Sequence, residues 1–135
     1  MEVLRFQHTY SYPFNRSGIA VPVFLGSGAL ETEVFAKVDI GADVCLFERN
    51  VALALDLDVE KGDPLWLETL TGSFLAYGHE VTVTTMELSF VLTVYFAAND
   101  AISRNLLGRS WVRLTRLGVV DYDGKLFVSA YDDEL

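Results

Sequence analysis

The sequence predicts an all-β domain, a small closed β barrel that carries one or two short helices. β-branched and aromatic residues recur in short runs, and glycine, proline, asparagine or aspartate separates one run from the next. Runs of this kind between turn-forming residues are typical of strands. Apolar residues at helical spacing occur in only two segments, which limits the helical content. At 135 residues the chain has the length of one domain, so we expect residues 1–135 to fold as a single unit.

The amino-acid composition limits which binding partners and which cellular compartment are expected. Hydrophobic residues make up 51% of the chain and aromatic residues 13%, enough to fill a core, and Trp66 and Trp111 are expected to be packing residues. The formal net charge of −9 argues against binding to nucleic acid or to an anionic membrane surface. The single cysteine, Cys45, excludes an intramolecular disulfide and suits the core better than a nucleophilic role. Neither a signal-like N-terminal run nor an apolar stretch of about 20 residues is visible, so a cytoplasmic location is expected.

The first half of the chain predicts an N-terminal extension, a hairpin and a helix. The extension covers residues 1–18 and is mixed in composition. Gly26-Ser27-Gly28 separates two β-branched runs, which we expect to pair as a hairpin. Pro22 in the earlier run indicates an edge position or a bulge. Ala and Leu at helical spacing predict a helix over Glu48–Leu57. The expected strands of this half are Val3–Phe6, Ile19–Leu25 and Leu30–Val38.

The second half predicts further strands, a second short helix and an acidic tail at residues 130–135. A polar, glycine-containing tip at Thr69–Ser73 joins two strands, so residues 65–79 form a hairpin. Apolar residues at i, i+3 and i+6 predict a helix over Ser110–Leu117. Asp123-Gly124 is a favoured two-residue turn between two later strands. The expected strands of this half are Leu65–Glu68, Phe74–His79, Glu80–Thr85, Leu88–Phe96, Leu106–Leu107, Val119–Tyr122 and Lys125–Ser129.

One acidic residue stands out within the apolar segment Phe35–Phe47. Asp39 comes at the end of a β-branched stretch, and Ile40, Gly41 and Ala42 follow it directly. A segment of this kind is poor helix material. It predicts a strand that ends in a tight turn and presents one carboxylate.

The segment Val38-Asp39-Ile40-Gly41-Ala42, together with Leu106-Leu107-Gly108 far downstream, resembles the retropepsin-like aspartic proteases. The signature of that family is hydrophobic-Asp-Thr/Ser-Gly-Ala early in the chain and hydrophobic-hydrophobic-Gly late. The resemblance covers roughly residues 19–129, and it departs at one signature position, where Ile40 replaces the usual Thr or Ser. It implies a closed barrel of the retropepsin type that works as a two-fold homodimer, with residues 1–18 at the dimer edge.

The resemblance also assigns roles to the turn and to the hairpin. Asp39 would be the catalytic residue, and the active-site turn around it would consist of Ile40, Gly41 and Ala42. The hairpin 65–79 would be the flap that covers the site and binds substrate through its main-chain N–H groups. The flap residues expected to do so are Thr71, Gly72 and Ser73. The alternative is an ordinary exposed hairpin.

The late signature segment would support the turn from below. It would pass close to the turn, because Gly108 lacks a Cβ atom that would prevent the approach. Asp43 and Arg109 match positions that form a charge pair in retroviral members, so we expect that pair here. The alternative is two separate surface charges, and an exposed pair contributes only about 0–1 kcal/mol. The expected supporting residues are Asp43, Leu106, Leu107, Gly108 and Arg109.

Hydrolysis of a peptide bond by carboxylates requires a pair of them. One is ionised and activates water, and the other is protonated and polarises the scissile carbonyl. The chain offers only one suitable Asp, because Asp123 is better explained as part of a hairpin turn. A protease of the type that the resemblance implies would therefore need two copies that meet with Asp39 and its symmetry mate at a two-fold axis. The expected partners are a second copy and a peptide or protein substrate. His8 and His79 lack further ligands at metal-binding spacing, so no metal and no cofactor are expected.

Ile40 leaves two hypotheses open. In the family, the hydroxyl at this position bonds to backbone across the dimer axis and braces the two turns, which an isoleucine cannot do. Each partner group left buried and unpaired costs about 1–3 kcal/mol, and apolar contact between the two isoleucines offsets part of that cost. The first hypothesis is a homodimeric aspartic endopeptidase. The second is a dimeric β barrel that binds peptides or a protein partner and has lost catalysis.

Overall fold

A computed structural model describes residues 1–134 of the chain. In this part of the chain ten strands alternate with two short α-helices and two 3₁₀ turns, which confirms the expected all-β class. None of the helices in residues 1–134 has the length and apolar character needed to cross a membrane. In chain order the elements are β1 (His8–Ser11), β2 (Ala20–Ser27), β3 (Leu30–Val38), β4 (Leu46–Phe47), α1 (Arg49–Ala54), η1 (Val59–Lys61), β5 (Asp63–Thr69), β6 (Gly72–Thr85), β7 (Leu88–Ala97), β8 (Leu106–Leu107), α2 (Arg109–Val112), β9 (Thr115–Val120), η2 (Asp121–Asp123) and β10 (Lys125–Ala130).

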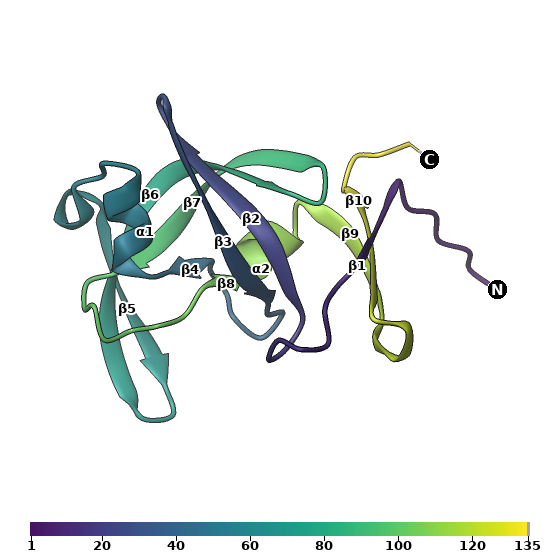
Figure 1. The fold of residues 1–135 in the computed structure, drawn as a ribbon, viewed down its shortest axis with the longest axis horizontal. Coiled ribbons are helices and arrows are strands. Elements are labelled where there is room, and N and C mark those ends of the chain that lie inside the picture. The colour runs from purple at the N-terminus through teal and green to yellow at the C-terminus, as the bar shows by residue number, and fades with distance from the viewer. Residues whose placement is uncertain (135) are drawn as a thin grey trace.

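The larger sheet has seven strands in the order β2-β3-β8-β4-β7-β6-β5 (Figure 1). An additional antiparallel pairing joins β2 to β6 through Phe24–Gly26 and Thr82–Thr84. Because of this pairing, six of the strands return on themselves around the core, and β5 extends the sheet beyond β6. The hairpin formed by β5 and the beginning of β6 projects away from the rest of the sheet (Figure 1).

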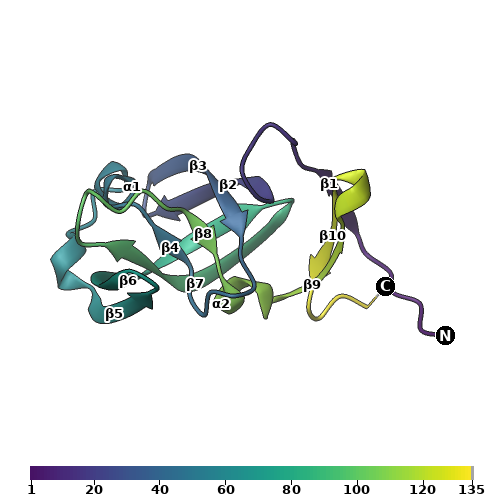
Figure 2. The same cartoon turned by 90° about the horizontal axis from the view of Figure 1, so that it is seen from below.

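A smaller sheet of three strands, in the order β1-β10-β9, lies beside the larger one and contains the first and the last strand (Figure 2). The strand expected over Val3–Phe6 is wrong, because the N-terminal strand is instead His8–Ser11. It pairs with Lys125–Val128 at the other end of the chain. Val3 is exposed, whereas Tyr12, just after β1, is buried and its hydroxyl donates to the carboxylate of Asp121. The position of this strand is therefore determined by pairing between the two ends of the chain.

The strand that was expected to break between His79 and Glu80 is continuous. β6 runs unbroken from Gly72 to Thr85, because its first half pairs with β5 and its length from Ala76 onward pairs with β7. Gly78 pairs on both sides, with Asp63 and with Tyr95. A residue that has partners on both edges remains in the strand whatever its own preference.

The helix expected over Ser110–Leu117 is also wrong beyond its first turn. α2 ends at Val112, and Thr115–Val120 form β9, which pairs with β10 along its whole length. The apolar spacing that indicated a helix thus spans a helical turn and a strand. The two-residue turn expected at Asp123-Gly124 is longer, because η2 precedes a left-handed Gly124 with φ of 62°. The first hairpin turns at Gly28 and Ala29, slightly later than expected.

The larger of two hydrophobic clusters among residues 1–134 joins the larger sheet, both helices and the smaller sheet. Its largest fully buried side chains come from distant parts of the sequence, and they include Leu25, Phe47, Phe96, Leu107, Trp111 and Leu126. The expected core positions of Cys45 and Trp111 are confirmed, since both side chains are fully buried. Burial raises the pKa of the Cys45 thiol, which keeps it protonated and unreactive.

Candidate active site

Asp39 directly follows β3, at the point where two segments distant in sequence meet. β3 and β8 pair in parallel, with Lys37 opposite Leu106 and Val38 opposite Leu107. The backbone N–H of Asp39 donates to the carbonyl of Leu107 at 2.9 Å, which continues this pairing one residue further. The position of the half-buried Asp39 is therefore set by the backbone of the late signature segment.

The turn after Asp39 is closed by the aspartate itself. The N–H of Gly41 donates to Asp39 Oδ1 at 2.9 Å, and the N–H of Ala42 donates to the Asp39 carbonyl at 3.2 Å. An aspartate that accepts from the backbone two residues later stabilises a turn of this kind. A Cβ atom at residue 41 would lie 3.2 Å from Asp39 Oδ1, which explains why glycine suits this position. Ile40 stands at the exposed tip of the turn, with 67% of its surface accessible in the protomer.

Gly108 contacts the backbone of the turn so closely that no side chain fits. A Cβ atom there would lie 2.1 Å from the carbonyl oxygen of Val44 and 2.8 Å from that of Ala42. Next to it, the N–H of Arg109 donates to the Ala42 carbonyl at 2.7 Å. The N–H of Ser110 donates to the Asp43 carbonyl at 3.1 Å. The expected close approach of the late segment is present, and main-chain hydrogen bonds hold it.

The side-chain charge pair expected between Asp43 and Arg109 is absent. Both residues are exposed, and none of the ion pairs among residues 1–134 joins them. The two segments instead meet through their backbones, as described above, so the alternative of two separate surface charges holds. Backbone contacts of this kind depend little on which charged side chains flank them.

The hairpin 65–79 has a tight tip that is braced by a threonine. Thr69 pairs with Gly72 across a two-residue loop, and Gly72 has a φ of 134° that favours glycine. Thr69 Oγ1 donates to the Gly72 carbonyl at 2.7 Å and accepts from the N–H of Thr71 at 3.3 Å. Thr71, Gly72 and Ser73 are all exposed. The hairpin exists where it was expected, and its role as a flap stays a prediction.

A cavity of about 680 Å³ lies between the Asp39 turn and the hairpin. Its walls are mainly apolar and combine the turn, β5 and β8. The lining residues are Asp39, Gly41, Ala42, Asp43, Val44, Leu46, Leu65, Trp66, Leu67, Glu68, Thr69, Leu70, Phe74, Arg104 and Leu106. The packing role expected for Trp66 is wrong, because this side chain is 65% exposed and faces the cavity. Trp66 alternates along β5 with the half-buried Leu65 and Leu67, a pattern that could have indicated that its side chain lies on the more exposed face of the strand.

A second cavity, of about 620 Å³, also contains Asp39 in its wall. Asp39, Arg104 and Leu106 line both cavities, so these residues lie at the boundary between the two. The remaining lining residues are Arg16, Ser17, Ala20, Phe35, Lys37, Ser103 and Asn105. Sequence reasoning missed Arg104. Its position just before the late signature segment is the one signal that could have found it.

Polar contacts hold the loop that carries Arg104 against the beginning of α1. Ser103 Oγ donates to Glu48 Oε1 at 2.9 Å, and Asn105 Nδ2 donates to Glu48 Oε2 at 3.1 Å. In return, the N–H of Glu48 donates to Asn105 Oδ1 at 3.1 Å. The residues on both sides of Arg104 are thus fixed, while its own side chain is exposed.

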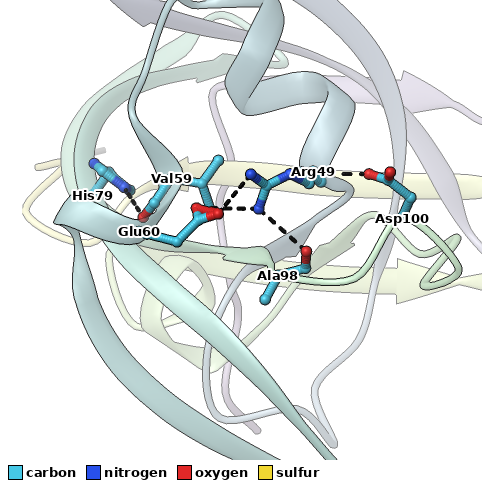
Figure 3. Close-up of polar contacts among 6 residues, drawn as sticks. All are labelled: Arg49, Val59, Glu60, His79, Ala98 and Asp100. Atoms are coloured by element: carbon cyan, nitrogen blue, oxygen red, sulfur yellow. Dashed lines mark hydrogen bonds and ion pairs between the residues drawn. The ribbon is translucent and has the colours of Figure 1, made fainter.

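Arg49 anchors the other end of the same loop (Figure 3). Its Nη2 donates to Glu60 Oε1 at 2.6 Å and its Nη1 to the Ala98 carbonyl at 3.2 Å. Asp100 Oδ1 lies 4.0 Å from Arg49 Nε. The hydrogen bonds from Arg49 hold the pKa of Glu60 below its usual value. This network joins α1, η1 and the end of β7, and it supports the loop outside the site itself.

Comparison with known proteins shows a likeness at the level of structure. No family model matches the sequence, and no curated protein matches it. Among solved structures, EIAV protease in complex with the inhibitor HBY-793 is similar, with a TM-score of 0.59 and 17% sequence identity. The match covers 77% of this chain and 92% of that chain.

The fold is retropepsin-like. A structural similarity at 17% sequence identity shows the fold alone. Any chemical activity of this chain therefore has to be argued from its own site. Within residues 1–134, no group of three or more His, Cys, Asp or Glu side chains is placed to hold a metal ion.

Proposed function

We propose that the chain is one protomer of a homodimeric aspartic endopeptidase. The observation that carries this proposal is the placement of Asp39. Asp39 is half-buried as a residue, its Oδ1 accepts a hydrogen bond from the N–H of Gly41, and it lines both cavities. One protomer supplies one such carboxylate, and peptide hydrolysis requires two that share a proton.

In the proposed mechanism the two Asp39 carboxylates lie on either side of the dimer axis. Like charges at close range cannot both ionise, so the pair holds one proton over a wide acidic range. The ionised member takes a proton from water as the water attacks the scissile carbonyl. The protonated member polarises the carbonyl oxygen and later protonates the leaving amine. The N–H of Gly41 donates to Asp39 Oδ1 and would help to orient the carboxylate.

The hairpin 65–79 would close over the substrate. An extended peptide in the cavity would lie between the Asp39 turn and the main chain near Thr71–Ser73, which would bind it as an added strand. The mainly apolar lining of this cavity favours an apolar side chain next to the scissile bond. Leu70, at the tip, is fully exposed in the protomer and would become covered in a closed dimer.

Ile40 replaces a hydrogen-bonded brace with an apolar contact. Fully burying an isoleucine side chain stabilises by about 1.5–3 kcal/mol, and 67% of Ile40 is available for burial. Contact between the two copies would therefore contribute roughly 1–2 kcal/mol per protomer. This is similar in size to the cost of about 1–3 kcal/mol for an unpaired brace partner. The dimer can thus form without the hydroxyl.

The second candidate function is a peptide- or protein-binding dimer without catalysis, and the absence of a hydroxyl at Ile40 favours it. The two candidates differ in one measurement, which is cleavage of an unfolded protein substrate from pH 3 to pH 7. We expect cleavage that is abolished in Asp39→Ala. Activity only in Ile40→Thr would mean an intact site that lacks its brace. If neither the unchanged protein nor Ile40→Thr cleaves the substrate, and a dimer is seen by sedimentation, the binding module is supported.

The acidity of the chain adds a pH dependence. The formal charge of a dimer is twice −9, that is −18, and this charge opposes association at low salt. Protonation of carboxylates below neutral pH reduces the repulsion and favours the shared-proton state. We expect tighter dimers and higher activity as the pH falls from 7 to 5. Dissociation of the dimer over that range, measured by sedimentation, would contradict the proposal.

A further inference from the structure

The cavity of about 620 Å³ beside Asp39 is lined by positive charge. Arg16, Lys37 and Arg104 all contribute to its wall, and Asp39 is the only acidic residue that does. This is unusual in a chain with 10 basic and 19 acidic residues, where a basic side chain has many carboxylates to pair with. None of the ion pairs among residues 1–134 involves any of these three residues.

The contacts of the Arg16 and Lys37 side chains do not neutralise their charges, and the backbone that carries Arg104 is fixed on both sides. The guanidinium of Arg16 lies 3.6 Å from the centre of the Phe35 ring. Lys37 Nζ donates to Ser17 Oγ at 3.2 Å. The backbone of Arg104 is held by Glu48 through the neighbouring Ser103 and Asn105. In none of these contacts does a carboxylate pair with one of the three cations. All three positive charges are therefore free to act on a ligand.

Positive charge that converges on a cavity creates a local field that attracts anions. A carboxylate that reaches two of these cations would form charge-assisted hydrogen bonds, which are about twice as strong as neutral ones. The other cavity, on the hairpin side of Asp39, is walled mainly by apolar side chains. The two cavities that meet at Asp39 therefore suit side chains of different chemistry.

We infer that the cavity around Arg16, Lys37 and Arg104 is a subsite for a carboxylate of the substrate, next to the scissile bond. The preferred substrate then combines an acidic residue with an apolar one. Because Asp39 lines the cavity and an extended peptide advances about 3.3 Å per residue, the acidic residue lies within one or two positions of the cleaved bond. The inference deepens the proposed endopeptidase function and rests on it for the cleavage measurement, whereas a binding measurement tests it without catalysis.

The test compares peptides that are acetylated and amidated and that differ at one residue. Each peptide contains a Phe, and each of the two positions on either side of it carries Glu, Gln or Lys in turn. We expect kcat/KM at pH 6 to be on the order of tenfold higher for the best Glu peptide than for its Gln counterpart, as one charge-assisted hydrogen bond implies. Because the Glu side chain has a pKa of about 4.3, this ratio should approach one at pH 3. A Gln peptide with a free C-terminus shows whether a terminal carboxylate can replace the side chain.

Variants of the subsite show whether these residues carry the preference. Arg104→Gln should lower the Glu-to-Gln ratio, and Arg104→Glu should shift the preference toward the Lys peptide. Lys61→Gln is the matched control, because it removes one exposed positive charge that lines neither cavity. Its ratio should equal that of the unchanged protein. Efficient cleavage at pH 6 with no preference for any carboxylate would overturn the inference.

A binding measurement tests the subsite even if the protein has no catalytic activity. The affinity of fluorescently labelled Glu and Gln peptides is measured on Asp39→Asn at pH 6 by anisotropy. Tighter binding of the Glu peptide that is lost in Asp39→Asn/Arg104→Gln supports the subsite, even if the unchanged protein cleaves nothing. Equal affinity for the two peptides refutes the subsite. The proposed peptidase function is then still decided by the cleavage measurement alone.

Discussion

Substitution of Gly108 by alanine tests how closely the late segment supports the Asp39 turn. The backbone of Gly108 is extended, with φ of −90° and ψ of −169°, so alanine itself is not strained there. The added methyl group would nevertheless lie 2.1 Å from the Val44 carbonyl oxygen and 2.6 Å from its carbon. Contacts shorter than about 3 Å are not tolerated by a close-packed interior, so the two backbones must separate.

The separation loosens three hydrogen bonds that join the turn to this segment. They are the bonds from the N–H groups of Asp39, Arg109 and Ser110, with lengths of 2.9, 2.7 and 3.1 Å. Each contributes about 0.5–1.5 kcal/mol, and overpacking adds about 1–3 kcal/mol. We expect Gly108→Ala to lower the free energy of unfolding by roughly 3–7 kcal/mol, a large part of the ~5–15 kcal/mol typical of a domain.

Urea denaturation and thermal melting of the two proteins measure this effect. A loss of this size lowers Tm by about 10 °C or more in a domain of this length. The matched control is Gly26→Ala in β2, where the nearest atoms to an added Cβ lie at 3.8 Å. That variant should be as stable as the unchanged protein. A Gly108→Ala variant that melts within about 2 °C of it would refute the argument that Gly108 is required by backbone contact.

Three further predictions concern the dimer, the loop anchor and the thiol. Ile40→Asn should weaken self-association by roughly 25-fold or more, because the apolar contact of about 1–2 kcal/mol per protomer is lost twice in the dimer; an unchanged Kd in sedimentation equilibrium would place Ile40 outside the interface. Glu60→Gln should destabilise the protein at neutral pH. Because Arg49 lowers the folded pKa of Glu60, the stabilisation is present above the ordinary carboxyl pKa of about 4.3 and is lost as pH falls through the lower folded pKa. The two denaturation curves should therefore converge in strong acid, and a difference that persists there would exclude the ion pair as its cause. Cys45 should react with a thiol reagent such as DTNB only after denaturation, because burial raises its pKa; fast labelling of the native protein would contradict its core position.

Local sequence patterns predicted the elements that depend on a few neighbouring residues. The strand Leu30–Val38 has the boundaries that its alternation indicated, and the hairpin around Leu70 and Thr71 forms where a polar tip separates two strands. The turn at Asp39 follows from an acidic residue before Gly41, since aspartate and glycine favour such turns by their own geometry. These features need no information about distant parts of the chain.

Elements that depend on a distant partner were not predictable in this way. β1 begins at His8 because it pairs with β10, more than a hundred residues later in the chain. β9 replaces the second half of an expected helix for the same reason. Such pairing overrides the weak local preference of either segment. The Asp43–Arg109 pair did not form, and main-chain hydrogen bonds, which the sequence does not display, join those two segments.

The sequence by itself determined an all-β chain with one turn that presents a single carboxylate, because strand and turn preferences act between near neighbours. The family resemblance already placed Gly108 close to that turn, whereas only the tertiary structure gathered Arg16, Lys37 and Arg104 in the wall of one cavity with Asp39. These residues come from separate parts of the chain and have no local reason to meet. Their convergence is decided by the pairing of β2, β3 and β8 around one core, which is a property of the whole fold.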